Sequence, residues 1–170
     1  AIIYGTINIG THKSVWEGQE KINDKLKILF EIPGHRQLYW KDDTELSPAT
    51  LIKDFNYIVT KNKKGTKSHL LDLIEKMFNT TLQASQYLSF DISQFLDMKV
   101  FVNVVHYINR EGALAAKVDT ITPLNPAFVD PNTLVRYNPL IAYSVQMGFD
   151  CLKNHKKVLL ILLQEEGLLC

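Results

Sequence analysis

The sequence predicts a mainly β protein that also contains helix: a five-stranded antiparallel barrel with one helix between strands three and four. Three observations support this prediction. Residues 99–124 have the pattern of a hairpin, and several other segments alternate apolar and polar side chains with the period of two that strands need. One further segment shows the three-and-four apolar spacing of a helix.

The hairpin at residues 99–124 is the clearest element. Its first strand carries valine at alternate positions, and residues 109–112 contain Asn and Gly, which adopt positive φ most readily in turns. The second strand alternates from residue 114 and ends at Pro123, because proline has no N–H to donate to a ladder.

Three more strands are expected before the hairpin. The first covers residues 2–9, and a polar connection at residues 10–19 separates it from the second, at 21–32, which Pro33 and Gly34 end. After a less regular stretch, in which residues 37–40 fit a short strand, the third strand covers residues 51–60.

Helices are expected at residues 68–78 and, in a shorter form, at 91–96. The first has apolar residues on one face, and Thr66 or Ser68 can cap its N-terminus. A third helix, at residues 149–169, forms a C-terminal extension whose apolar run is shorter than the ~20 residues a membrane span needs.

This order of strands and helix is that of the OB-fold. We expect an OB-like barrel over residues 1–124, followed by an extended tail and the C-terminal helix over residues 125–170. Because this helix is apolar around much of its circumference, we expect it to be buried on more than one side. One side would lie on the barrel or on the Pro-containing segment and the other against a second subunit, which predicts a homodimer through the helix. The alternative is that the helix only covers the end of its own barrel.

Composition narrows the functional classes. The 170 residues carry a net charge of +1, so a surface for an anionic partner has to come from local clustering of charge. The two cysteines form no disulfide framework, the five histidines have no metal-ligand spacing, and no nucleophile motif is visible. We therefore expect a cytoplasmic protein without a cofactor, a metal, a membrane span or catalytic activity.

Basic and aromatic side chains alternate along the second and third strands. Lys25 and Lys27 share a face of the second strand, and Lys53, Phe55 and Tyr57 share a face of the third. Single-stranded nucleic acid is bound by positive grooves with aromatic faces for stacking, so these five residues are candidate contacts. The alternative, which alternation leaves open, is that Phe55 and Tyr57 fill the barrel.

A lysine-rich turn follows the third strand. Lys61, Lys63, Lys64 and Lys67 lie within seven residues, which predicts phosphate contact, although a solvated turn has the same composition.

Further candidate contacts lie in or near loops. Tyr39 and Trp40 are aromatic residues beside turn signals, and they either plug a barrel end or stack on bases. Tyr107 and Arg110 lie close to the hairpin tip and are candidate contacts at the rim, with plain solvent exposure as the alternative.

Several short motifs together resemble the phage-encoded and prophage-encoded single-stranded-DNA-binding proteins of OB fold. They are WEGQE at 16–20, KLKILFEIP at 25–33, FNYIVT at 55–60, KSHL at 67–70, VNVVH at 102–106, AKVDTITP at 116–123 and, more weakly, NPLIAY at 138–143. The resemblance implies an accessory of phage DNA replication or recombination that binds single-stranded DNA and proteins of those processes in the host cytoplasm. The alternative function is a non-catalytic OB module for protein interaction or structure.

Overall fold

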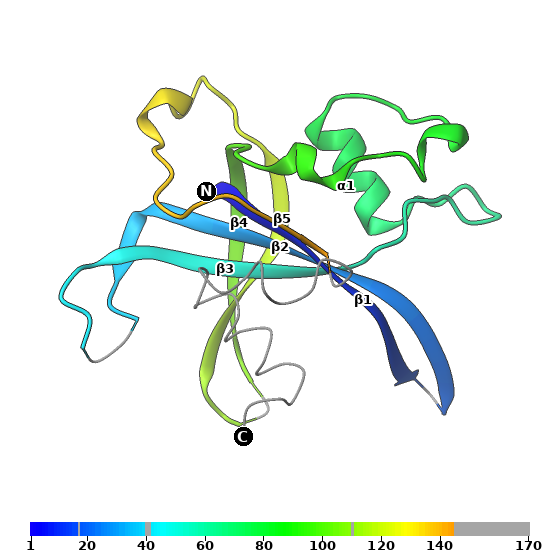
Figure 1. Ribbon diagram of the computed structural model, residues 1–170, viewed down its shortest axis with the longest axis horizontal. Helices are drawn as coiled ribbons and strands as arrows, with labels where there is room; N and C mark the ends of the chain where they lie inside the picture. The colour runs from blue at the N-terminus through cyan, green and yellow to red at the C-terminus, as the bar shows by residue number, and fades with distance from the viewer. Residues whose placement is uncertain (17, 40–41, 110, 145–170) are drawn as a thin grey trace.

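The computed structural model describes residues 1–16, 18–39, 42–109 and 111–144 (Figure 1). Over these residues the chain is mainly β, as predicted, and the single α-helix α1 (His69–Met77) lies between the third and fourth strands. The described strands are β1 (Ile2–Trp16), β2 (Gln19–Gln37), β3 (Ser47–Asn56), β4 (Val100–Ile108), β5 (Leu114–Pro123) and β6 (Ile141–Ser144).

β1 and β2 form a hairpin that is much longer than predicted. The segment expected as a polar connection belongs to both strands, and the pairing continues to Trp16 opposite Gln19. This end of the hairpin projects from the core (Figure 1), so its side chains are mostly exposed and show no apolar alternation. Polar pairs join its strands instead, since the Thr11 hydroxyl donates to Asp24 Oδ1 at 2.6 Å.

The boundaries of β2 and β3 also differ from the prediction. β2 continues beyond Pro33 and Gly34, because an irregularity in its pairing with β3 between Ile32 and Arg36 accommodates these residues. β3 begins at Ser47 and ends at Asn56, four residues earlier at each end than the apolar alternation indicated.

The strands pair as two sheets and do not close into the predicted barrel. One sheet has the order β3-β2-β1-β6 and the other is the hairpin of β4 and β5, which confirms the predicted hairpin. β4 joins the start of β1 through the isolated bridge between Ile2 and Lys99. β5 lies beside β3, but no backbone ladder joins these two strands in the described part of the chain.

The main core lies between β2, α1 and the β4–β5 hairpin. Ser68 caps α1 as predicted, since its hydroxyl accepts the N–H of Leu71 at 3.2 Å. The apolar face of the helix lies beside β3 and β5 and shares one core with alternate residues of β2, among them Leu26, Ile28 and Phe30, all fully buried. A 3₁₀ helix (Ile92–Phe95) replaces the short helix expected at residues 91–96.

A buried carboxylate attaches the segment after β5 to the sheet. Glu31 of β2 is fully buried and accepts hydrogen bonds from Tyr137 N, Asn138 N and Asn138 Nδ2 at 2.7–2.8 Å. This anchor brings β6 beside β1, where the two strands pair in parallel. β6 was not predicted. The expected helix at residues 149–169, and the homodimer through it, lie outside the described residues.

Candidate nucleic-acid interface

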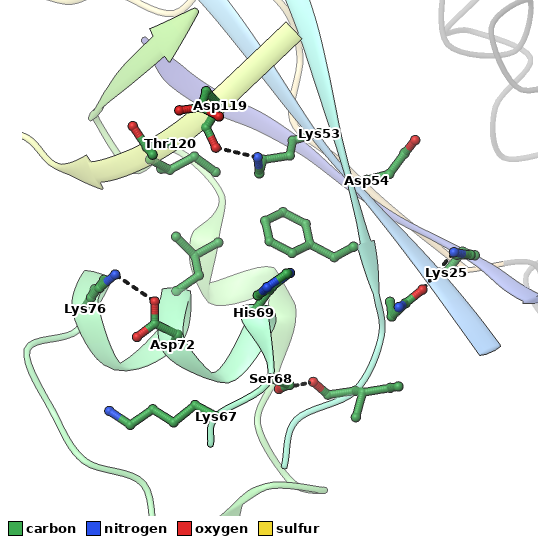
Figure 2. Close-up of a pocket in the computed structure, with 15 residues that line it drawn as sticks. Lys25, Lys53, Asp54, Lys67, Ser68, His69, Asp72, Lys76, Asp119 and Thr120 are labelled. Carbon is green, nitrogen blue, oxygen red and sulfur yellow. Dashed lines mark hydrogen bonds and ion pairs between the residues drawn. The ribbon is translucent and has the colours of Figure 1, made fainter. Parts of the chain in front are cut away.

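A groove of about 690 Å³ lies between β3, β5 and α1 (Figure 2). Four lysines line it together with His69: Lys25, Lys53, Lys67 and Lys76. Apolar side chains, among them Leu73 and Ile121, form part of its wall. The groove therefore brings together candidates that the sequence placed on two strands and one loop.

Lys53 spans the open seam between β3 and β5. Its Nζ donates to the backbone carbonyl of Asp119 at 2.6 Å (Figure 2). It also donates to the backbone carbonyl of Val118 at 2.8 Å. Burial lowers the pKa of this ammonium and Lys117 lowers it further, while Asp119 opposes the shift. Because its donors are directed at β5, Lys53 fastens two strands that have no ladder between them.

The other lysines of β2 and α1 also have partners. Lys27 is only 3% exposed and pairs with Asp54 at 2.9 Å, so it does not present its charge to a ligand, contrary to the prediction. Lys25 donates to Asn56 Oδ1 at 2.7 Å. Lys76 pairs with Asp72 one turn earlier on α1 at 2.7 Å. Among the groove lysines, Lys76 therefore pairs with a carboxylate, whereas Lys25 and Lys53 donate to neutral oxygen atoms.

The aromatic residues of β3 and the segment after it belong largely to the core. Phe55 is 6% exposed within the main core and its side chain also lines the groove, so its burial favours the alternative that it fills the core over stacking on bases. Tyr57 is half-buried against the same core, and burial, with a smaller effect of Asp91, raises the pKa of its hydroxyl.

Tyr39 lies away from the groove, near the start of β3. Its hydroxyl donates to Pro48 O at 2.9 Å and accepts the N–H of Thr50 at 2.6 Å, which fastens the β2–β3 connection. Trp40 and Arg110, two further candidates, lie outside the described residues.

Tyr107 is the exposed aromatic candidate, with 43% of its surface accessible near the end of β4. The ammonium of Lys117 on β5 lies 5.2 Å from the centroid of its ring. Lys117 was not predicted as a contact, although the turn at residues 109–112 implies a register that places this lysine diagonally opposite Tyr107. The pair lies on the hairpin that projects from the core (Figure 1).

The lysine loop (residues 61–67) is an ordered hairpin. Lys61 and Lys67 form a β-bridge, and Asn62 Oδ1 accepts the backbone N–H groups of Lys64 and Thr66, both at 2.9 Å. Gly65 completes the turn with φ of 79°, a conformation that favours glycine. The loop is thus preorganised by its own backbone contacts.

The lysines of this loop divide into two kinds. Lys67 lines the groove and pairs with the buried Glu75 of α1 at 2.5 Å, and this hydrogen bond is the main cause that lowers the pKa of the Glu75 carboxyl. Lys61, Lys63 and Lys64 are exposed, and no described acidic side chain forms an ion pair with them. These three side chains therefore form a cluster of positive charge within one short loop.

No family model, curated protein or solved structure matches the chain. The resemblance to phage single-strand-binding proteins therefore stays a prediction. Among the described residues, no group of three or more His, Cys, Asp or Glu side chains is arranged to hold a metal ion. The same part of the chain contains no helix that is both long and apolar enough to cross a membrane.

Proposed function

We propose that this chain binds single-stranded DNA without sequence preference and supports phage-type DNA replication or recombination. The observation that carries the proposal is the lysine loop, which presents Lys61, Lys63 and Lys64 unpaired among the described residues, beside a groove. Positive side chains that contact phosphates release condensed counterions, and this drives binding of any sequence. The setting in replication or recombination rests on the resemblance alone.

The arrangement of strands supports an OB-type fold as part of the proposal. The order of β1, β2, β3, α1, β4 and β5 is that of an OB barrel, and β4 and β5 lie beside β1 and β3 as a barrel requires. Lys53 bridges the seam at which such a barrel closes. In OB proteins the strand faces and the hairpin loops bind oligonucleotides, which fits the exposed Tyr107 on the β4–β5 hairpin.

The test is a titration of labelled single-stranded DNA at several salt concentrations with the wild-type protein and a triple variant, Lys61→Gln, Lys63→Gln and Lys64→Gln. Binding should weaken for every sequence, and the slope of log affinity against log salt should become shallower by about 2, roughly 0.7 for each lost contact. The matched control replaces the same lysines with arginine, which keeps the charge, so its slope should stay that of the wild type.

Two results would refute the proposal. If the wild-type protein binds no single-stranded DNA even at low salt, the chain has another function, and a protein-interaction module is the first alternative. If the protein binds but the glutamine variant keeps the wild-type slope, the lysine loop does not belong to the interface. Thermal unfolding of each variant checks that its fold is intact, because exposed loop substitutions usually change stability by no more than ~0.5 kcal/mol.

A further inference from the structure

The outer edge of β4 leaves backbone groups without partners. Val100 N donates to the carbonyl of Ala1 at 2.9 Å, whereas Asn109 N points to the opposite side and donates to Ala113 O at 2.9 Å. Alternation along the strand then directs both backbone groups of each even-numbered residue away from β5. Beyond the contact with β1, no described residue pairs with the outward groups at positions 102, 104, 106 and 108.

Nothing in the sequence of this edge protects it against pairing. Residues 101–108 read FVNVVHYI, with no lysine, acidic residue or proline, and with β-branched or aromatic side chains at most positions. Exposed edges in soluble proteins usually carry such charges or prolines, because open backbone groups otherwise recruit another strand. The edge of β3 has this protection, since it carries Pro48, Lys53 and Asp54.

The outer half of the β4–β5 hairpin also lacks packing. Ile108 and Leu114, paired across the hairpin, are 65% and 71% exposed, and the hairpin extends away from the four-stranded sheet (Figure 1). A ribbon of two strands is marginally stable in water, and a third strand or further packing is generally needed. An additional strand on β4 would supply partners for the open backbone groups and packing for the hairpin.

We propose that the β4 edge binds the β4 edge of a second copy of this chain, antiparallel and about a two-fold axis at Val105. In this register residue 104 lies opposite residue 106 of the second copy, and residue 102 lies opposite residue 108. Both N–H and C=O groups of all four outward residues then find partners, which gives about eight hydrogen bonds across the axis. The product is a four-stranded sheet with closed two-fold symmetry.

The side chains agree with this register. Asn103 lies opposite Tyr107 of the second copy, and Val105 lies opposite itself, so no two like charges face each other across the axis. A register with two-fold symmetry uses one surface twice and needs no second, different surface. An unrelated strand would need its own complementary side chains, whereas this edge already complements itself.

The experiment measures the molar mass of the full chain by light scattering over a range of concentrations. The wild-type protein should dimerise. Val105→Lys places two ammonium groups directly opposite each other and should raise the dissociation constant about tenfold or more. Thr122→Lys adds the same charge on the exposed outer face of β5 and should leave the dimer unchanged.

A disulfide tests the register itself. Residues opposite each other in a non-hydrogen-bonded antiparallel pair are close enough for a disulfide, so Val105→Cys should cross-link two copies under mild oxidation. The background carries Ser at both native cysteines, and Thr122→Cys is the control that should stay uncross-linked. A wild-type protein that is monomeric throughout, or a dimer unaffected by Val105→Lys and not cross-linked by Val105→Cys, would overturn the proposal. If Val105→Lys fails to fold, the cross-link alone decides.

Discussion

Replacing Lys53 with methionine separates a structural lysine from a phosphate contact. Lys53 lies in the groove of the proposed interface, but its ammonium donates to the carbonyls of Val118 and Asp119 on β5. Methionine keeps most of the apolar stem of Lys53 and removes its ammonium, which lies 5.9 Å from the centroid of the Phe55 ring. We therefore expect Lys53→Met to lower the stability of the fold and to leave the electrostatics of DNA binding nearly unchanged.

The size of the loss follows from the geometry. Hydrogen bonds to a charged group contribute about 1.5–3 kcal/mol each when they are well shielded from water. Lys53 is half-buried at an open groove, so water screens its charge and can hydrate the two carbonyls after the substitution. We expect a decrease in the free energy of unfolding of about 1–2 kcal/mol for both contacts together.

Urea unfolding measures the stability, and the DNA titration at several salt concentrations measures the charge contribution. Lys63→Gln is the matched control, because it removes one ammonium that lacks a described partner. It should leave the unfolding midpoint unchanged and make the salt slope shallower by about 0.7. The reasoning is refuted if Lys53→Met is as stable as the wild type and loses the same share of the slope as Lys63→Gln.

Two further predictions concern buried carboxylates. Glu31→Gln places an amide donor opposite the N–H groups of residues 137 and 138, so we expect the free energy of unfolding in urea to fall by roughly 2–4 kcal/mol. The exposed control Glu45→Gln should lower it by less than about 0.5 kcal/mol, and equal losses would contradict the anchoring role of Glu31. The pKa of the Glu75 carboxyl in the folded protein lies below the usual 4.5, mainly because of its hydrogen bond with Lys67. The ionised Glu75 therefore stabilises the fold fully above pH 4.5, and this stabilisation is lost as the pH falls through the lower pKa of the folded state. Unfolding midpoints measured across this acidic range should fall less steeply for Glu75→Gln than for the wild type, and parallel curves would contradict the linkage.

The local elements could be predicted because local chemistry determines them. The turn at residues 109–112 and the alternation on either side identify the β4–β5 hairpin, and a hydroxyl at Ser68 before a three-and-four apolar pattern identifies α1. The polar ends of β1 and β2 escaped prediction because a hairpin that projects from the core needs no apolar face. β6 was not predicted because its position depends on the contact of Glu31 with Tyr137 and Asn138, which follow it in the sequence by 106 and 107 positions.

The candidate site could be predicted only in part, because alternation gives neighbours on a strand and not the partners across the fold. Phe55 and Lys53 share a parity, as expected, but this face of β3 turns toward α1 and β5. The phenyl ring is therefore buried, while the longer lysine side chain reaches the β5 carbonyls. Lys27 occupies a position in the alternation that is typical of a surface lysine, but it is buried and pairs with the exposed Asp54. Such pairings depend on register between strands, which one sequence does not specify.

The proposed dimer through β4 bears on the proposed DNA binding, because one chain has only one lysine loop. The three exposed lysines of the lysine loop correspond to a salt slope of only about 2, which is a small electrostatic contribution for a protein that holds a strand at physiological salt. A two-fold dimer carries two lysine loops, and a strand bound at one loop meets the other at a high effective concentration, provided that it is long enough to span both. Short oligonucleotides, which reach one loop, would not gain from the dimer. In a chain with a net charge of +1, the proposed dimer would therefore double the number of lysine loops that one long strand can contact.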